Sequence, residues 1–336
     1  MIREIKLNNQ GKFIFAAVLA AATTATHAQT FCIFDPSGTQ GDSFALMKDY
    51  ALVAKQWGAD LSLKAYNNEE QVTKEYKAGH CDAAAMTAIS ARAFNNFAAS
   101  IDSVGGIVNK EQTKIILTLM GNPKLAPDMI SNGNEIAGVI GLGSGYIMVN
   151  DRRLNNLQQV IGKKMAIFEN DRAGQTILEK IGAIPVSVTL GTVGVKFNSG
   201  EIDIIYLPAM AFKPLDISKG MGSKGGVIRY PVVTLTYDIL IRPEKFPDGY
   251  GQKSRTWFMD NLNRQMANID KIERSIEPRY WVDIPASDAK GYTQILRASR
   301  ISLTRAGIYD KKMTGILKKI RCRQDPSNAE CSLTDE

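Results

Sequence analysis

The chain has 336 residues, of which 44% are hydrophobic and 22% are charged, and its formal net charge is +7. This length is sufficient for two domains of ordinary size. The basic residues are spread along the chain without a block of like charges, which argues against a nucleic-acid-binding arm, so we expect no nucleic acid among the partners.

Residues 1–28 have the features of an export signal. Three basic residues precede an apolar run from Phe13 to about Ala25, and small residues follow up to Ala28. A run of about 13 residues is shorter than the roughly 20 that a helix needs to span a bilayer. We therefore predict a signal peptide at residues 1–28, cleaved near Ala28, and a periplasmic protein.

The next part of the chain predicts alternating strands and helices. Residues 31–34 read as a strand, and a turn leads to a helix that Asp42 or Ser43 caps and Gly58 ends. A strand at 59–66, a helix at 68–77, a short buried strand at 81–86 and a helix at 90–101 follow. Apolar runs at 114–120 and 136–149 predict two further strands.

Residues 161–208 predict a β-α-β-α-β unit, which requires parallel strands. Asn170 or Asp171 can cap its first helix, Gly182 ends that helix, and the alternating segment IPVSVTL reads as a strand. A helix that stops at glycine before a Cys-Asp or Ile-Asp strand occurs at Gly79 and again at Gly200. This repetition indicates two similar lobes.

The segments GKK, IGAIPV and NSGEIDII resemble the second lobe of the periplasmic solute-binding proteins of tripartite ATP-independent (TRAP) transporters. The resemblance implies an α/β, two-lobed (type II-like) protein with parallel-rich sheets flanked by helices and an interlobe ligand cleft. It also implies a small-molecule ligand, a membrane transporter as partner, and no enzymatic activity. Those proteins usually bind a substrate carboxylate through an arginine at the position that Ala166 occupies here.

Two alternatives to a transporter's binding protein are considered. Similar exported proteins are labelled accessory components of RND-type multidrug efflux linked to aminoglycoside resistance, which would make efflux subunits the partners. The other alternative is an exported enzyme on the same scaffold. After removal of the signal the only histidine is His80, at a helix-to-strand corner, so we expect no catalytic triad, no metal site and no cofactor.

We expect the following domain organisation. Lobe 1 takes residues 29–150 and 232–253, lobe 2 takes 151–231, and helices at 254–322 brace both lobes. A Gly-rich loop, SKGMGSKGG, closes lobe 2, and the glycines of GLGSG form a turn. The polar tail at 323–336 is expected to be loose apart from its disulfide.

Four cysteines remain after the signal, and an even number in an exported protein favours disulfides. Cys32 and Cys81 lie on strands that would be neighbours in the proposed sheet, while Cys322 and Cys331 would close a short loop. We predict these two pairs. A four-cysteine metal site would need paired close spacings such as C-x-x-C, which are absent.

Ligands of parallel sheets bind at the carboxyl ends of the strands, where loops and helix N-termini converge. This rule predicts ligand-binding residues in both lobes and on the segment that returns to lobe 1: Asp35, Ser37, Gln40, Thr87, Ser90, Arg92, Glu169, Asn170, Arg172, Tyr206, Met210 and Tyr237. Arg92 or Arg172 would suit an organic anion, whereas Asp35, Glu169 or Asp171 would suit a cationic amine. Capping of helices and turns is the alternative role for Asp35, Ser37 and Asp171.

Overall fold

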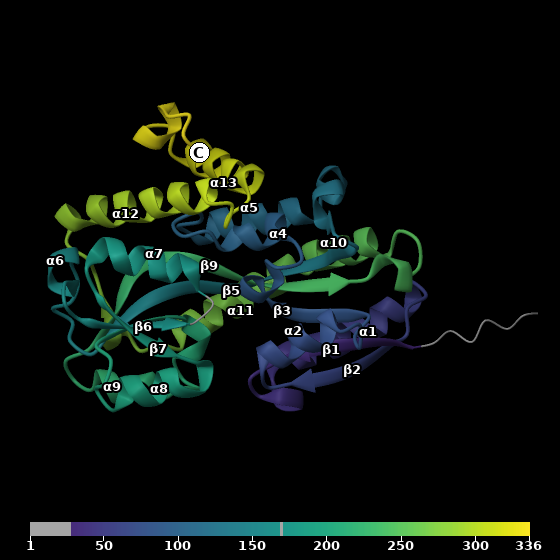
Figure 1. Ribbon diagram of the computed structural model, residues 1–336, viewed down its shortest axis with the longest axis horizontal. Helices are drawn as coiled ribbons and strands as arrows, with labels where there is room; N and C mark the ends of the chain where they lie inside the picture. The colour runs from purple at the N-terminus through teal and green to yellow at the C-terminus, as the bar shows by residue number, and fades with distance from the viewer. Residues whose placement is uncertain (1–27, 169–170) are drawn as a thin grey trace, which may run out of the picture.

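The computed structural model describes residues 28–168 and 171–336, so all but the last residue of the predicted signal peptide at 1–28 lies outside the described residues. Figure 1 shows two α/β lobes side by side, with the C-terminal helices above them. Within the described ranges, no helix combines the length and the apolar character that a membrane crossing would need.

The strands are short at both ends of the molecule and long in its middle. They are β1 (Gln29–Phe34), β2 (Leu61–Tyr66), β3 (Ala83–Thr87), β4 (Ile130–Ser131), β5 (Asn134–Val149), β6 (Lys164–Phe168), β7 (Ile184–Val188), β8 (Ile204–Pro208), β9 (Gly226–Ile241) and β10 (Trp281–Val282). The first three belong to lobe 1 and β6 to β8 belong to lobe 2.

The helices flank these strands and also form the C-terminal part of the chain. They are α1 (Asp42–Gln56), α2 (Glu69–Lys77), α3 (Ala88–Ala91), α4 (Asn96–Ala99), α5 (Lys110–Met120), α6 (Leu157–Val160), α7 (Arg172–Ile181), α8 (Leu190–Asn198), α9 (Ile217–Met221), α10 (Tyr250–Asp260), α11 (Leu262–Arg274), α12 (Ala286–Arg305) and α13 (Lys311–Gln324).

The described strands form one mixed sheet in the order β2-β1-β3-β9-β5-β8-β6-β7. Each lobe contributes three parallel strands, as the sequence predicted, but β9 and β5 pair in antiparallel fashion with each other and with the adjoining strands β3 and β8. Both central strands run for 16 residues and pass from one lobe into the other. The two lobes are therefore built on the two halves of one continuous sheet.

The register of the sheet places the carboxyl ends of the two sets of parallel strands opposite each other. The last residue of β3, Thr87, is paired with Tyr237 in the middle of β9, and the last residue of β8, Pro208, is paired with Gly145 in β5. Because both sets end near the middle of the long strands, their carboxyl ends meet between the lobes.

The β-α-β-α-β prediction for residues 161–208 matches the order β6, α7, β7, α8, β8. Asp171 caps α7 by accepting the Gly174 N–H, and Gly182 ends the helix with a φ of 68°, a conformation that glycine adopts without steric cost. Position 166 lies on β6 and is almost fully buried. The alternation of this segment therefore identified its elements correctly.

Other local predictions were wrong. Residues 114–120 belong to helix α5, because Asn109 caps its N-terminus and Ile116, Leu117 and Met120 recur at helical spacing on the buried side. The predicted helix at 90–101 is divided into α3 and α4, since Asn95 caps a new helix. The Gly-rich loop contains α9.

The glycines of GLGSG lie within β5 rather than in a turn. The register against β9 shifts between Gly141 and Gly143, and Gly143 has a φ of 95°. A Cβ at Gly141 would lie 3.0 Å from Leu117 and 3.1 Å from Ile269, which come from helices packed on the sheet. Glycine here allows both a bulge in a long strand and close approach of the covering helices.

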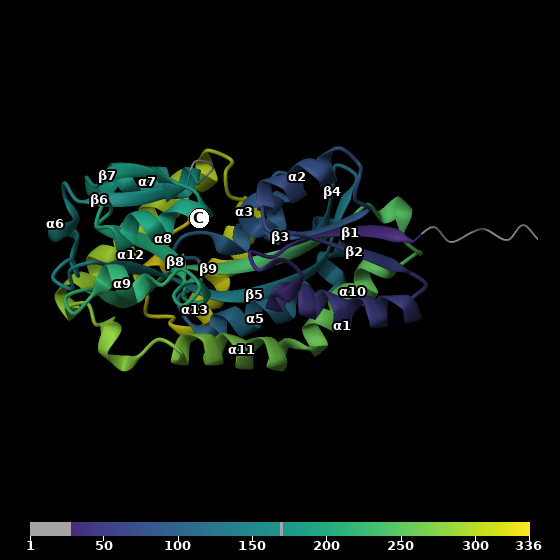
Figure 2. The ribbon, with the colours of Figure 1, turned by 90° about the horizontal axis from the view of Figure 1, so that it is seen from below.

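The C-terminal helices contact both lobes. α12 packs on α6 and α7 of lobe 2, while α13 packs on α4 and α5 beside lobe 1. α11 lies along the lower edge of the molecule in Figure 2 and packs on α5 and β5. Its Glu273 accepts from the Tyr146 hydroxyl at 2.9 Å and pairs with Lys110 at 2.8 Å. Through α12 and α13 the C-terminal part of the chain therefore packs on elements of both lobes.

The two disulfides are the pairs expected from the sequence. Cys32 on β1 is bonded to Cys81, which directly precedes β3, with 5.9 Å between their Cα atoms. Cys322 at the end of α13 is bonded to Cys331. The second bond closes a short loop at the start of the tail.

The tail is ordered, contrary to the prediction that it would be loose. Glu330 is 6% exposed and accepts from Arg321 Nε at 2.6 Å and from a terminal nitrogen of Arg300 at 3.2 Å. The fully buried Glu336 side chain forms ion pairs with the same two arginines. Arg300 also donates to the Val104 carbonyl at 2.9 Å, so the network joins the tail, α12 and lobe 1.

We expect Glu330→Ala to lower the free energy of unfolding by about 3–5 kcal/mol, because it leaves the two buried arginines, Arg300 and Arg321, with the single carboxylate of Glu336 to balance them. Glu277→Ala is the control: Glu277 pairs with Arg279 at 3.0 Å and its side chain is 60% exposed, so a loss of about 0–1 kcal/mol is expected. Urea unfolding measures both. Equal losses would show that the buried network does not stabilise the protein.

Candidate functional site

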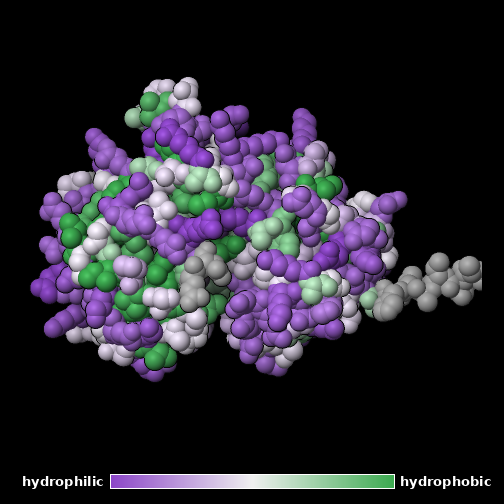
Figure 3. All heavy atoms as spheres, in the orientation of Figure 1, coloured by the Kyte–Doolittle hydropathy of each residue, from purple (hydrophilic) through white to green (hydrophobic). Residues whose placement is uncertain are grey.

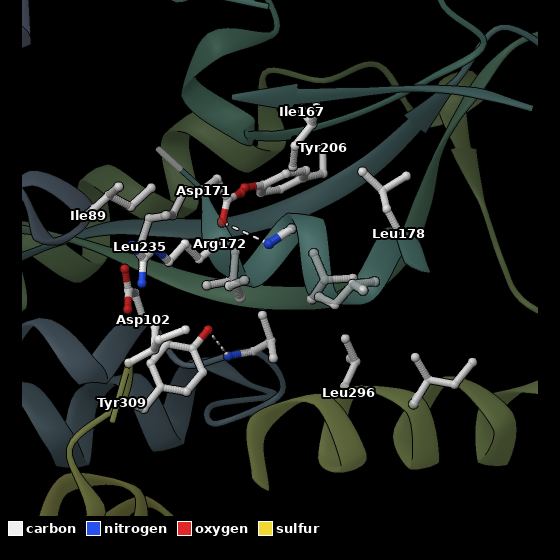
Figure 4. A pocket seen from close by; sticks show the side chains of 18 of the residues that line it. Ile89, Asp102, Ile167, Asp171, Arg172, Leu178, Tyr206, Leu235, Leu296 and Tyr309 are labelled. Atoms are coloured by element: carbon white, nitrogen blue, oxygen red, sulfur yellow. Dashed lines mark hydrogen bonds between the residues drawn. The ribbon is translucent and has the colours of Figure 1, made fainter. Parts of the chain in front are cut away.

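A cavity of about 590 Å³ lies between the two lobes, and we call it the interlobe pocket. Lobe 1 contributes the α3–α4 segment and Asp102, lobe 2 contributes β6, α7 and β8, and β5 and β9 form the wall between them. The remaining wall comes from α12 and from residues 306–309. Figure 3 shows the surface hollowed between the lobes, and Figure 4 shows the pocket from close by.

Most of the pocket wall is apolar. The aliphatic side chains come from β6, α7, β9 and α12, and include Met165, Ile167, Ile177, Leu178, Ile181, Val232, Val233, Leu235, Ile295 and Leu296. Three tyrosines, Tyr206, Tyr292 and Tyr309, also line it. Such a wall favours a ligand with an apolar body, whose burial is driven by the hydrophobic effect.

Arg92 lines the pocket, but its guanidinium group is already paired with other residues of the protein. Its guanidinium forms an ion pair with Asp102, donates to the Ala99 and Ile308 carbonyls at 3.3 Å each, and lies 5.1 Å from the centre of the Tyr309 ring. Burial raises the pKa of Asp102, and the attraction of Arg92 partly offsets that rise. The charge of this pair is internally balanced.

Asp171 is the second buried carboxyl group of the pocket. It is 7% exposed, and its Oδ1 accepts the Gly174 N–H at 2.8 Å. Its Oδ2 has no hydrogen-bond partner in the part of the chain that the structure describes. Burial raises the pKa of Asp171 to about 6, the Gly174 N–H lowers it, and the negative charge of Asp102 raises it. One oxygen of this carboxyl group is thus covered in the pocket wall without a partner among the described residues.

Arg172 and Tyr206 complete the set of predicted residues that line the pocket. Arg172 begins α7 and is exposed, so it lies at the rim. Tyr206 on β8 is partly buried and, in Figure 4, lies beside Asp171 on the opposite side of the pocket from Asp102 and Tyr309. Arg92, Arg172 and Tyr206 therefore line one pocket with residues from both lobes.

Asp35, Ser37 and Gln40 lie outside the interlobe pocket. Asp35 accepts the Ser37 N–H at 2.9 Å and the Phe44 N–H at 3.0 Å, which caps α1. A Cβ at Gly41 would lie 1.8 Å from its carboxylate, so glycine is required there. Ser37 lines a separate open hollow beside Tyr66, and Gln40 is exposed. The alternative role of Asp35, capping, is the one that the structure shows.

Three further predicted residues belong to the interior of lobe 1. Thr87 donates its N–H to Glu69 at 2.6 Å, and Ser90 also lies within the reach of that carboxyl group. The Tyr237 hydroxyl donates to the Phe34 and Ala85 carbonyls. These contacts hold β1, β3, β9 and α2 together behind the pocket rather than lining it.

The remaining predicted positions are placed as follows. Glu169 and Asn170 lie outside the described residues, and Met210 does not line the pocket. His80 is exposed and contacts Glu75 at 2.9 Å, away from the pocket. No cluster of three potential metal ligands occurs among the residues that the structure describes.

No pattern in the sequence marks the α12 wall or Asp102 as part of a site. Tyr292 and Leu296 are four residues apart and therefore share one face of α12, but that spacing is equally typical of a helix that only braces its neighbours. Asp102 lies in a short turn between α4 and α5 with no motif around it. Only the folding of α12 over lobe 2 makes these residues part of a site.

Comparison with known proteins identifies the family. Residues 51–336 match the sequence profile of the family described as solute-binding protein AdeT 1/2. The chain is 45% identical over 304 residues to an Acinetobacter baumannii protein named probable solute-binding protein AdeT1, an alignment that covers 90% of this chain and 100% of that protein. The chain belongs to the AdeT 1/2 solute-binding family.

Solved structures show that this AdeT 1/2 family member has the fold of TRAP solute-binding proteins. One from Desulfovibrio desulfuricans, with bound sn-glycerol-3-phosphate, has a TM-score of 0.71 at 11% identity and covers 91% of this chain and 100% of its own. One from Desulfovibrio salexigens, with bound orotic acid, has a TM-score of 0.67 at 13% identity, covering 88% and 99%. The two-lobed α/β prediction is confirmed, and the relatives are solute-binding proteins rather than enzymes.

Asp238 gives this AdeT 1/2 family member a testable pH dependence of stability. It lies fully buried on β9, accepts from the Thr236 hydroxyl at 3.3 Å, and its Oδ2 has no partner among the described residues. Burial, reinforced by the negative charge of Asp102, raises its pKa to about 8. The folded protein therefore holds a proton here that the unfolded chain releases near pH 4.

Stability from this proton is fully present below about pH 4 and is lost as the pH rises to about 8. In the unmodified protein the free energy of unfolding should decline between pH 5 and 8. We expect Asp238→Asn to reduce the slope of this decline by about 1.4 kcal/mol per pH unit. Urea unfolding at several pH values measures this, with the exposed Asp260→Asn as the control. An unchanged slope in Asp238→Asn would contradict the assignment of the proton.

Proposed function

We propose that this protein captures a small molecule in the interlobe pocket in the periplasm and presents it to a membrane transporter. The observation that carries the proposal is the pocket itself, because its walls come from both lobes and from the two long strands that join them. A molecule bound there would contact α7 of lobe 2 and the α3–α4 segment of lobe 1 together. Binding would thereby favour a closed arrangement of the lobes.

Closure would bend the sheet where it is least regular. β5 departs from regular pairing with β9 at Gly141/Gly143 and at Gly145/Tyr146, next to the pocket wall at Ile147 and Val233. A bulge leaves ladder groups unpaired and concentrates twist in a few residues. These positions would serve as the hinge while the parallel strands of each lobe move as rigid units.

We propose that the ligand differs from those of the two neighbours, which are organic anions. Ala166 supplies no positive charge, and Arg92 already pairs with Asp102. Arg172 at the rim is the remaining cation among the described lining residues. A small molecule with a single negative charge would therefore meet Asp171 and the internally balanced Arg92–Asp102 pair inside the pocket, and one arginine at its edge.

Filling the pocket tests the proposal. Ala173 on α7 lines the pocket, so Ala173→Trp should occupy the space of the ligand and abolish ligand binding. A thermal-shift screen of amines, carboxylates and sugars on the unmodified protein supplies the ligand, which at 100 times its Kd should stabilise by about 2.7 kcal/mol. Val195→Trp, at a 69% exposed position of α8, is the matched control. Undiminished binding by Ala173→Trp would refute the site.

Lobe closure gives a second, independent prediction. We expect the radius of gyration from solution scattering to decrease when the identified ligand is added, because both lobes contact it. Ala173→Trp should show no decrease at the same ligand concentration. If the ligand binds but the scattering of the unmodified protein does not change, the hinge described above is wrong.

A further inference from the structure

Only one of the two oxygens of the Asp171 carboxyl group has a hydrogen-bond partner among the described residues. Its Oδ1 caps α7 through the Gly174 N–H at 2.8 Å. Its Oδ2 is buried in the wall of the interlobe pocket and has no partner among the described residues. Buried polar atoms in proteins almost always have a partner, and capping a helix needs only one of the two oxygens. The fold therefore leaves the second oxygen, covered in the pocket wall beside Gly174 and Ile167, without a partner, and a ligand donor that reaches it would supply one.

The surroundings of this oxygen leave its negative charge unbalanced. Arg92 lines the same pocket, but it pairs with Asp102, and the repulsion of Asp171 by Asp102 outweighs its attraction to Arg92. Arg172 lies at the rim with an exposed side chain. Gly174 and the apolar residue Ile167 occupy the other side of the carboxyl group. A cation that enters the pocket would be the counter-ion that the fold does not supply.

The rest of the pocket limits what else that cation carries. Aliphatic residues of α7, β9 and α12 form most of the wall, and the aromatic ring of Tyr206 lies beside Asp171. A second ammonium group would lose its hydration against these walls without a free carboxylate to compensate. A carboxylate or phosphate group would be repelled by Asp171, because the charges of Arg92 and Asp102 offset each other. The pocket suits one positive charge on an apolar body.

We infer that the interlobe pocket binds a monoamine with an apolar, aromatic or aliphatic body, whose ammonium group donates a hydrogen bond to Asp171 Oδ2. This inference rests on the proposed function and specifies its ligand class. In Figure 4 the side chain of Tyr206 extends toward Asp171 with its hydroxyl end, and this hydroxyl would accept a second hydrogen bond from the ammonium. The apolar body lies against Leu178, Leu235 and Leu296.

Gly174 positions the carboxyl group for this contact. A Cβ at position 174 would lie 2.7 Å from Asp171 Oδ2 and 2.5 Å from Ile167 Cδ1, which is closer than real Cβ contacts. Gly174→Ala would therefore displace the carboxyl group without removing its charge. It provides a second variant that alters the proposed contact by a different route.

Isothermal titration calorimetry at pH 7.5 with three probes of similar size and shape tests the inference. The probes are 2-phenylethylamine, 2-phenylethanol and 3-phenylpropionate, which carry a positive, no and a negative charge. We expect the amine to bind at least tenfold more tightly than the alcohol, and the propionate most weakly, because a charge-assisted hydrogen bond is stronger than a neutral one.

Variants of Asp171 and Gly174 test whether the ammonium group contacts Asp171. Asp171→Asn should weaken amine binding by about tenfold to a hundredfold while changing alcohol binding less than threefold, and Gly174→Ala should also weaken the amine selectively. Asp216→Asn, at an exposed position of the same lobe, is the matched control and should have no effect. Circular dichroism and thermal unfolding check that each variant is folded.

Two results would overturn the inference while leaving the proposed function intact. One is the tightest binding by the propionate, with loss of that binding in Arg172→Ala. The other is amine binding that Asp171→Asn and Gly174→Ala leave unchanged but that Ala173→Trp abolishes. Failure of the proposed function is distinct, because it requires a ligand whose binding Ala173→Trp does not affect.

Discussion

The antiparallel pairing of β5 with β9 is the constraint on which the rest of the structure depends. Each strand runs through both lobes, so their shared hydrogen bonds attach the parallel strands of lobe 1 and those of lobe 2 to a single ladder. The two parallel sets then run in opposite directions and end near the middle of the long strands. The polar loops and the N-terminus of α7 meet there, and the pocket forms where they meet.

The polarity of the pocket follows from which charges the fold has already paired. Arg92 is held by Asp102, two carbonyl oxygens and the Tyr309 ring, so it contributes to holding lobe 1 against the segment after α12. Asp171 has a backbone partner for one oxygen only. An arginine that lines a site is therefore not by itself an anion-binding group, because its partners decide what charge a ligand encounters.

The C-terminal tail is connected to the pocket through helix α12. Leu296 faces the pocket, and Arg300, one turn further along α12, binds Glu330, Glu336 and the Val104 carbonyl. The N–H of Val104 in turn donates to the Tyr309 hydroxyl at 3.4 Å. The buried ion pairs therefore fix the helix that supplies one wall of the pocket, and the Cys322–Cys331 disulfide restrains the residues that carry Glu330.

The sequence by itself determined the elements that depend on local patterns. The β6-to-β8 unit and the cap of α7 could be predicted, because alternation, capping residues and the glycine at 182 act over a few neighbouring positions. The two cysteine pairs and the two-lobed architecture were predicted from the proposed sheet, the repeated helix-Gly-strand motif and the resemblance to TRAP solute-binding proteins. Segment 114–120 was misread because β-branched residues in a short apolar run fit a strand or a helix equally well.

Tertiary structure decided the site. Asp35 and Asp171 both cap helices, yet only Asp171 retains an oxygen in the interlobe pocket, since both oxygens of Asp35 are used around α1. Asp102, Tyr292 and Tyr309 became lining residues only when α12 and the segment after it folded over lobe 2. Such contacts join residues about 70 to 200 positions apart, and no local pattern records which partners a side chain finds at that separation.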